Sequence, residues 1–100
     1  MQKGGYVYIL ATPNRRSLYT GVTSNLFKRI WEHRNLVDGN CYTARYNCVM
    51  LVYYCRFNSI EDAIAEEKRI KGGKRRQKEQ LIESMNYGWR DLWVDIENSF

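Results

Sequence analysis

Two short runs of β-forming residues around a compact polar turn constrain the N-terminal part of this chain. The runs cover about Tyr6–Ala11 and Leu18–Val22, and the turn between them, residues 12–17, carries a proline, an asparagine and a serine. This pattern predicts a β-hairpin, because aromatic and β-branched residues favour strands and the turn residues favour a reversal of the chain. Side chains alternate along a strand, so Tyr6 and Tyr8 are expected on the same face.

The rest of the chain alternates helix and strand signals. Thr23 or Ser24 can cap a helix over about residues 25–36, because a hydroxyl group satisfies free N–H groups of the first turn. The further predicted elements are a polar loop over residues 37–48, a strand over Val49–Phe57, a helix over Ile60–Lys71 capped by Asn58 or Ser59, a break at Gly72-Gly73, and a helix over about Arg75–Met85. The order β-β-α-β-α-α predicts a single α+β domain over residues 1–100, with a small three-stranded antiparallel β-sheet flanked by helices.

Apolar residues at helical spacing indicate which helix faces pack on the sheet. The expected apolar stripes are Leu26, Phe27, Ile30 and Trp31 in the first helix, Ile60, Ala63, Ile64 and Ile70 in the second, and Leu81, Ile82 and Met85 in the third. After a turn at residues 86–88, Trp89, Leu92 and Trp93 are expected to fold back over the core. Large aromatic side chains are usually well buried, which favours packing over a protein contact for these residues.

Composition argues against several classes of protein. One hundred residues with 44% hydrophobic content suffice for one core of modest size. No apolar run approaches the roughly 20 residues of a membrane span, and no signal-peptide pattern opens the chain, so a cytoplasmic protein without a membrane partner is expected. Cys41, Cys48 and Cys55 lack paired spacing and accompany a single histidine, which indicates structural thiols rather than a disulfide framework or a zinc site.

Glu67 is hard to explain by packing alone. It projects near the middle of the apolar stripe of the helix over Ile60–Lys71, whereas Glu66 lies toward the edge of that stripe. An inward-facing carboxylate is unfavourable unless it meets a cation, a metal ion or a cleft. A buried ion pair with a nearby Arg or Lys is one interpretation, and a functional site is the favoured one. A single carboxylate, with water and phosphate oxygens as the other ligands, suits Mg²⁺.

Four other side chains can complete a phosphodiester-cleaving site around such a metal. Arg29 and His33 stand one turn apart on the same helix, and Arg29 is suited to hold a phosphate. His33 is either a proton shuttle or phosphate contact, or a structural histidine. Tyr8 or Tyr19 could activate water with the help of nearby cations, since a free tyrosine with a pKa of about 10 is a weak base at neutral pH. Composition alone favours packing for each tyrosine, because tyrosine is common in strands.

Positive charge is concentrated in one stretch of a chain whose net charge is +5. Residues 68–78 contain seven basic side chains and no acidic one. Such a cluster binds phosphates by charge and gives affinity without sequence reading. The alternative is an ordinary solvated helix face. The candidate nucleic-acid contacts are Lys68, Lys71, Lys74, Arg75, Arg76 and Lys78.

Two triplets together with two later residues resemble the GIY-YIG nuclease domain: Tyr6-Val7-Tyr8, Tyr19-Thr20-Gly21, Arg29 and Glu67. The similarity extends over residues 18–34, 46–47, 51–54, 63–71 and 89–92, and it is greatest to the small stand-alone bacterial members of that family. The chain departs from the family pattern in having Tyr6 for the glycine and Val7 for the isoleucine of the first triplet. Thr20 likewise replaces the middle isoleucine of the second triplet.

The resemblance implies a fold, an activity and a set of site residues. The implied fold is a three-stranded antiparallel sheet between helices, in agreement with the pattern of strands and helices. The implied active site consists of Tyr8, Tyr19, Arg29 and Glu67, with one divalent cation, Mg²⁺ or Mn²⁺, on Glu67. The implied reaction is attack of an activated water on a phosphodiester, in which His33 is a further candidate to assist.

These observations predict a metal-dependent endonuclease that acts on DNA, with RNA as the other substrate to consider, in DNA repair or processing. Since the sequence shows no attached recognition module, we expect selection by nucleic-acid structure rather than by base sequence. A first alternative is a nucleic-acid-binding module with little or no turnover. A second is an interaction subunit of a larger complex, for which Trp89, Leu92 and Trp93 would be contact residues if they were exposed.

Overall fold

The computed structural model describes residues 4–35 and 49–99 of the chain. Its elements are β1 (Gly5–Ala11), β2 (Leu18–Thr23), α1 (Leu26–Arg34), β3 (Met50–Phe57), α3 (Ile60–Lys71), α4 (Arg75–Met85) and α5 (Trp93–Ser99). The predicted α+β fold with a three-stranded antiparallel sheet is confirmed. Helix α5 is an addition, because the predicted order ended with the helix now labelled α4. The predicted loop, with Cys41 and Cys48, lies outside the described residues.

Strand β1 lies in the middle of the sheet, in the order β2-β1-β3, and pairs antiparallel with both neighbours. Tyr8 at the centre of β1 faces Gly21 on β2 and Tyr54 on β3. The pairing with β3 shifts between Ile9 and Leu10, where the ladder has an irregularity. The hairpin predicted from the first two runs of β-formers is therefore present, and it places the two tyrosine-bearing triplets side by side.

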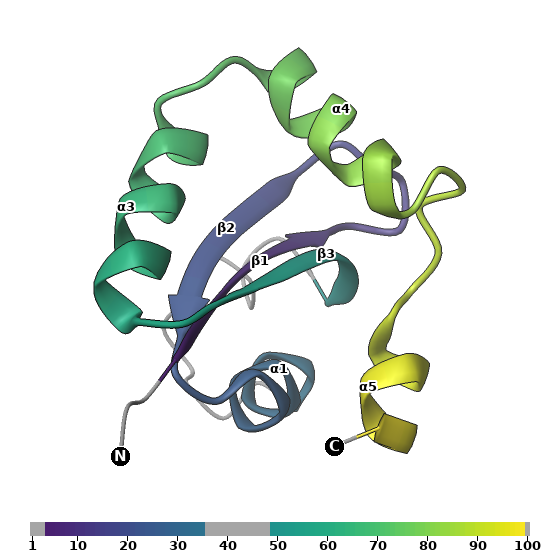
Figure 1. The fold of residues 1–100 in the computed structure, drawn as a ribbon. Helices are drawn as coiled ribbons and strands as arrows, with labels where there is room; N and C mark the ends of the chain where they lie inside the picture. Colours follow the sequence, from purple (N-terminus) through teal and green to yellow (C-terminus); the bar gives the residue numbers. More distant parts are fainter. Residues whose placement is uncertain (1–3, 36–48, 100) are drawn as a thin grey trace.

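Helices cover both faces of the sheet. Helices α3 and α4 lie over one face and α1 and α5 over the other, as Figure 1 shows. The core under α3 and α4 contains Val7, Ile9, Ala11, Val52, Tyr53, Ala63, Ile70, Ile82 and Trp89. The core under α1 and α5 contains Tyr8, Leu10, Leu26, Ile30, Leu51, Leu92, Trp93 and Ile96. The predicted alternation along the first strand is thus confirmed, with Tyr6 and Tyr8 on the α1 face.

Helix starts depend on side-chain caps. Asn25, rather than the predicted Thr23 or Ser24, caps α1, where its side-chain oxygen accepts from the backbone N–H of Lys28 at 3.1 Å. Thr23 supports this cap, because its hydroxyl oxygen accepts from the backbone N–H of Asn25. Asparagine is as good an N-cap as serine, so composition alone did not distinguish these neighbouring candidates. Ser59 caps α3, as one of the two predicted residues.

Three residues assigned to apolar stripes are exposed, and those assignments are wrong: Trp31, Ile64 and Met85. In α1 the inward positions are taken by Leu26, Ile30 and His33, which recur at helical spacing. Trp31 follows Ile30 directly and is turned about 100° away from the buried face. The same rotation carries Ile64 away from the buried Ala63, while Met85 is the last residue of its helix.

The segment after α4 folds back onto the sheet. Trp89, Leu92 and Trp93 are buried, as predicted, which removes the contact surface that the interaction-subunit alternative required. Asp91 fastens the segment, because one of its carboxylate oxygens accepts from Arg34 at 2.7 Å and the other from the backbone N–H of Leu51 at 3.2 Å. Within the described ranges, no helix is long and apolar enough to cross a membrane.

Candidate active site

The hydroxyl group of Tyr8 is the centre of the candidate site. It lies 3.0 Å from Nε2 of His33, in a buried contact between the middle strand and the end of α1. Both side chains expose only 1% of their surface. Alternation along β1 turns Tyr8 toward α1, and the helical repeat from Leu26 and Ile30 turns His33 toward the sheet. A protonatable ring and a phenol therefore meet where either can pass a proton to the other.

Gly21 makes room for the Tyr8 ring on the neighbouring strand. A Cβ atom at Gly21 would collide with the Tyr8 hydroxyl, would lie 2.5 Å from its Cζ, and would lie 3.0 Å from Cε1 of Tyr19. Real Cβ atoms essentially never approach other atoms that closely. Sequence reasoning did not count Gly21 among the site residues, although its pairing opposite Tyr8 follows from the hairpin register. Glycine is thus needed here for space.

Tyr19 completes an aromatic cluster with Tyr8 and His33. Its ring centroid lies 6.3 Å from that of Tyr8 and 5.4 Å from that of His33, and the Tyr8 and His33 centroids lie 5.7 Å apart. The rings are tilted relative to one another, an arrangement that favours aromatic contacts. The predicted site residues Tyr8, Tyr19 and His33 are therefore brought together by β1, β2 and α1.

Burial and the neighbouring groups shift the pKa of Tyr8 in opposite directions. Burial has the largest effect and raises the pKa of Tyr8, and the neighbouring Tyr19 raises it further. A hydrogen bond and the positive charge of Arg29 lower this pKa, while the negative charge of Glu67 raises it slightly. The net direction is upward, so Tyr8 is a neutral phenol at neutral pH. Arg29 and Glu67 are both near enough to influence the same hydroxyl group.

Arg29 is held in place from its own helix. Its Nη1 lies 3.2 Å from Oε1 of Glu32, and both side chains are about three-quarters buried. An open cleft of about 350 Å³ adjoins the guanidinium, lined by Thr23, Ser24, Asn25, Lys28, Arg29 and Glu32. A guanidinium held in one orientation between a cleft and a buried hydroxyl is suited to receive an anionic oxygen.

Glu67, rather than its neighbour Glu66, lies close enough to the tyrosine cluster for its charge to raise the pKa of Tyr8. Its side chain is only 13% exposed, and its Oε2 lies 2.8 Å from Nζ of Lys71, one turn later on α3. Glu66 instead binds Arg69 through two hydrogen bonds, and those bonds lower its pKa. The charge of Glu66 raises the pKa of Tyr53, whereas the charge of Glu67 raises the pKa of Tyr8. Both interpretations of Glu67 therefore keep support, since it forms an ion pair with Lys71 and its charge also acts on Tyr8.

The donor atoms present fit a hard divalent cation. Among the described residues, no group of three or more His, Cys, Asp or Glu side chains is placed to hold a metal ion. A zinc site, which needs several protein ligands, is not formed by them. A single carboxylate such as Glu67 suits Mg²⁺ or Mn²⁺, which take their other ligands from water and from phosphate oxygens.

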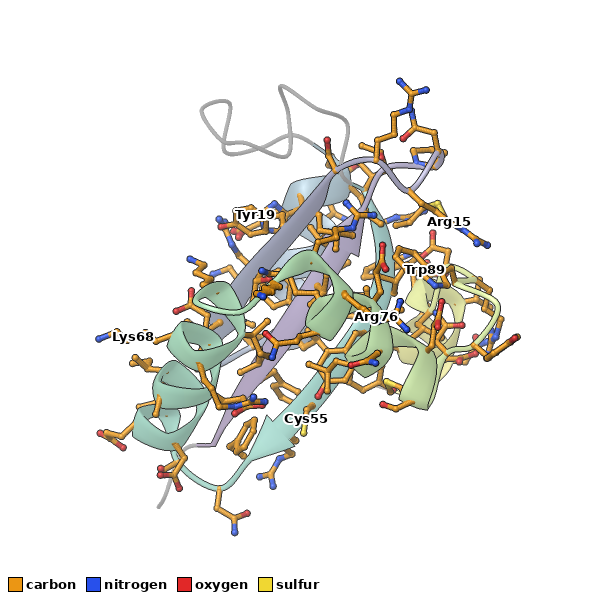
Figure 2. All side chains as sticks on the ribbon, turned by 90° about the horizontal axis from the view of Figure 1, so that it is seen from above. Arg15, Tyr19, Cys55, Lys68, Arg76 and Trp89 are labelled. Carbon is orange, nitrogen blue, oxygen red and sulfur yellow. The ribbon has the colours of Figure 1, made fainter. Side chains whose placement is uncertain are left out.

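The basic segment divides into residues with partners and residues that face solvent. Arg75 pairs with Glu79 at 3.0 Å and donates to the backbone oxygens of Arg15 and Arg16 in the hairpin turn. Lys78 donates from Nζ to the backbone oxygen of Gly73 at 2.9 Å. Lys71 is exposed but pairs with Glu67, and the exposed candidates outside these contacts are Lys68, Lys74 and Arg76; Figure 2 shows Lys68 on the outer side of α3. The segment thus combines anchoring contacts with exposed charge.

The anchored part of this segment fixes the hairpin turn beside the C-terminal turn. Arg15 donates to the backbone oxygen of Gly88 at 3.0 Å, and its guanidinium lies 5.2 Å from the ring centroid of Trp89. Figure 2 shows Arg15 and Trp89 on the same side of the molecule. Arg15 and Trp89 both adopt left-handed backbone conformations, with φ of 63° and 56°. Arg75 donates to the backbone oxygens of Arg15 and Arg16 in this same hairpin turn. Arg75 therefore stabilises the fold, which weakens its assignment as a phosphate contact.

Comparisons with known proteins agree with this arrangement. The profile described as the GIY-YIG catalytic domain matches residues 4–80, which include both triplets, the α1 arginine and the α3 glutamate. The chain belongs to the GIY-YIG family. A UPF0213 protein of Clostridium perfringens is 47% identical over 79 residues, covering 79% of this chain and 83% of that protein. A UPF0213 protein of Bacillus velezensis is 30% identical over the full length of both chains.

A solved structure shares the fold of this GIY-YIG protein. The UPF0213 protein of Bacillus halodurans, determined by NMR in solution, superposes with a TM-score of 0.56 and is 34% identical. The match covers 88% of this chain and 92% of the other. The UPF0213 names state no substrate. The family membership therefore places the chain among GIY-YIG domains and identifies neither a substrate nor a metal.

The raised pKa of Tyr8 gives a test of the buried environment. The contribution of this hydroxyl to stability is complete below the ordinary tyrosine pKa of about 10 and is lost as pH rises from there toward the raised pKa. Between about pH 9 and about pH 11, the wild type is expected to lose about 1.4 kcal/mol of unfolding free energy relative to Tyr8→Phe. Denaturant titrations of both proteins at the two pH values measure this difference. An unchanged difference would mean that Tyr8 ionises in the folded protein with its ordinary pKa.

Proposed function

We propose that this GIY-YIG protein is a divalent-metal-dependent endonuclease that hydrolyses phosphodiester bonds in DNA. The observation that carries the proposal is the buried contact between the Tyr8 hydroxyl and Nε2 of His33, beside Arg29 and within reach of the charge of Glu67. A proton acceptor, a cation for phosphate and a carboxylate for a metal ion are the parts that such a hydrolysis requires. The family membership supports the same conclusion.

Tyr8 serves in this mechanism as a proton relay that stays neutral. A water molecule attacks phosphorus while its proton passes to the Tyr8 oxygen, and the phenolic proton passes to Nε2 of His33. The P–O bond to the leaving strand breaks, and His33 ends as an imidazolium. Because burial raises the pKa of Tyr8, a relay is more favourable than formation of a free tyrosinate. This step needs the His33 tautomer in which Nε2 carries no proton.

Arg29 holds the scissile phosphate in this mechanism. Its ion pair with Glu32 orients the guanidinium, and its position beside Tyr8 puts the phosphate next to the attacking water. Negative charge grows on the phosphate oxygens in the transition state, so a fixed cation stabilises that state more than the ground state. Tyr19 packs against Tyr8 and His33 and restricts the orientation of both rings.

Glu67 would hold the metal ion. When bound, Mg²⁺ or Mn²⁺ stabilises the charge that develops on the leaving oxygen. The side chain of Glu67 is 13% exposed, and Lys71 lies against its Oε2. A cation that keeps most of its water ligands suits such a position.

DNA is the proposed substrate, bound through its phosphates. The exposed Lys68 lies on the helix that carries Glu67, Lys74 lies between α3 and α4, and Arg76 lies in the first turn of α4. Contacts of this kind neutralise phosphates and read no bases, so flaps, branches, nicks or single strands are expected to be preferred over a particular sequence. A role in DNA repair or processing is consistent with such a preference.

Cleavage of a panel of labelled DNAs tests the proposal. Linear, nicked, flapped, branched and single-stranded substrates, with matched RNA strands, would be incubated with Mg²⁺, with Mn²⁺ and with EDTA. We expect products from at least one DNA structure with either metal and none with EDTA. Nucleic-acid affinity that persists in EDTA without any product would instead support the binding-module alternative, and selective cleavage of RNA would overturn the choice of DNA.

A further inference from the structure

The ammonium of Lys71 lies against Oε2 of Glu67, one of the two oxygens with which this carboxylate would hold a metal ion. We propose that the Lys71 ammonium is a resident counter-ion that a divalent cation must displace, and that the displaced lysine then binds a substrate phosphate. The proposal rests on the proposed function in one respect, namely that Glu67 is the metal ligand. It adds a role for Lys71 as a residue that couples metal binding to nucleic-acid binding.

The ion pair is placed where it neutralises the carboxylate in the metal-free protein. Nζ of Lys71 lies 2.8 Å from Oε2 of Glu67, and residues four apart on a helix face one another. Glu67 is 13% exposed and Lys71 is 52% exposed, so the carboxylate is fixed in a partly buried position while the lysine is the partner that can move. An ammonium is a compact point charge on a flexible stem, which suits a partner that is exchanged rather than permanent.

The surroundings give the released ammonium a second position. Lys71 is the last residue of α3, and it lines an open cleft of about 240 Å³. The cleft is lined by Leu18, Tyr19, Thr20, Lys71 and Lys78. Tyr19 belongs to the aromatic cluster of the candidate site, so this cleft borders that cluster. With Lys78 on its wall, the cleft already offers positive charge to an anion.

Glu66 provides a contrast on the same helix. Its partner Arg69 binds it through two hydrogen bonds, at 2.7 and 2.5 Å, and the charge of Glu66 raises the pKa of Tyr53 rather than that of Tyr8. A bidentate guanidinium is a pre-organised partner and releases a carboxylate less readily than a single ammonium does. The two adjacent glutamates therefore differ in the kind of cation that holds them, and the one held by a single ammonium is the one whose charge acts on Tyr8.

Two consequences follow for metal and nucleic-acid binding. In the absence of nucleic acid, Lys71 competes with a divalent cation for Glu67 and lowers the affinity for metal. When a phosphate enters the cleft, it attracts the ammonium and frees the carboxylate, so each ligand increases the affinity for the other. The protein would then bind its metal tightly only with nucleic acid present.

Direct measurement of Mn²⁺ binding tests the competition without any cleavage reaction. Binding to the full chain without DNA would be followed by electron paramagnetic resonance for wild type, Lys71→Met, Lys71→Arg and Arg69→Met. We expect Lys71→Met to bind Mn²⁺ about three- to tenfold more tightly than wild type. Lys71→Arg keeps the charge and should restore the weaker binding. Arg69→Met removes one charge and one ion pair from the same helix without touching Glu67, and should stay within about twofold of wild type.

A Glu67→Gln variant in the same series separates the two proposals. If Glu67→Gln binds Mn²⁺ as well as wild type does, Glu67 is not the ligand and the proposed metal site fails. If Glu67→Gln loses binding while Lys71→Met binds no more tightly than wild type, the competition by Lys71 is overturned and the metal site stands. Circular dichroism of each variant would verify that α3 and the sheet remain folded.

A separate measurement tests whether the Lys71 ammonium moves from Glu67 to a substrate phosphate. The affinity for single-stranded DNA would be measured at several salt concentrations, in EDTA and in Ca²⁺, for wild type and Lys71→Met. One extra phosphate contact in a single strand steepens the plot of log affinity against log salt by about 0.7. We expect this difference between the two proteins in Ca²⁺ and not in EDTA. Equal slopes of the two proteins in Ca²⁺ would overturn the transfer.

Discussion

Glu67→Gln is expected to lower the rate of metal-dependent DNA cleavage by about 10³-fold or more. Glutamine keeps the size of the side chain but loses the negative charge that would hold Mg²⁺ or Mn²⁺. Without the metal, charge on the leaving oxygen loses its main stabilisation, and effects of this size follow from the loss of a single stabilising group. Single-turnover cleavage of the best substrate in the panel measures the loss.

Glu66→Gln is the matched control for this prediction. The two glutamates are adjacent on α3 and both form ion pairs, but Glu66 binds Arg69 and acts on Tyr53 rather than on Tyr8. Its replacement is expected to change the cleavage rate by less than about threefold, since an exposed ion pair contributes little. Equal losses of cleavage rate in both variants would show that either negative charge on α3 has the same effect, and that Glu67 is not a specific metal ligand.

Gly21→Ala is expected to impair both folding and cleavage. The added methyl group would overlap the Tyr8 ring and its hydroxyl and would press on Tyr19. Overpacking of this kind costs about 1–3 kcal/mol of unfolding free energy. The Tyr8 ring and its oxygen must also shift to make room, and a shift of about 1 Å at a reacting group can lower a rate by about 10²-fold. Denaturant unfolding and single-turnover cleavage measure the two effects.

Gly88→Ala is the control for the general cost of replacing a glycine. A Cβ atom at Gly88 would meet nothing within 4 Å, so stability should change by less than about 0.5 kcal/mol. In a Tyr8→Phe background the cost of Gly21→Ala should be smaller, because the colliding hydroxyl is gone. Additive losses of stability in the double variant would show that the Tyr8 hydroxyl is not the main cause of the overlap, and would leave the collision with the ring atom Cζ.

Local pattern was sufficient for most of the fold. Runs of β-formers around the turn predicted the hairpin, and alternation along the first strand placed Tyr8 opposite to Val7 across the sheet. The helix over Ile60–Lys71 was predicted with the bounds that α3 has. These features depend on residues that are close in the sequence, and backbone periodicity alone determines which side chains share a face.

The local sequence pattern gave wrong predictions where packing against another element determines which of several apolar residues is buried. Trp31 is as apolar as Ile30, and only the packing of α1 on the sheet turns Ile30 and His33 inward and leaves Trp31 outside. Helix α5 was missed because it is short and its buried contacts, through Trp93 and Ile96, are with the sheet and α1. In both cases burial of apolar surface against another element outweighed the local signal.

The sequence by itself determined the strands, most helix bounds, the inward direction of Glu67 and the residues that resemble GIY-YIG nucleases. Only the tertiary structure decided that Tyr8 meets His33, that Gly21 lies beneath the Tyr8 ring, and that Arg75 fastens the hairpin turn while Lys71 holds Glu67. Most of these contacts join residues far apart in the sequence, and a periodic pattern carries no information about the partner across such a separation. Lys71 and Glu67 are close in the sequence, yet the position of their ion pair beside the tyrosine cluster depends on how α3 packs on the sheet.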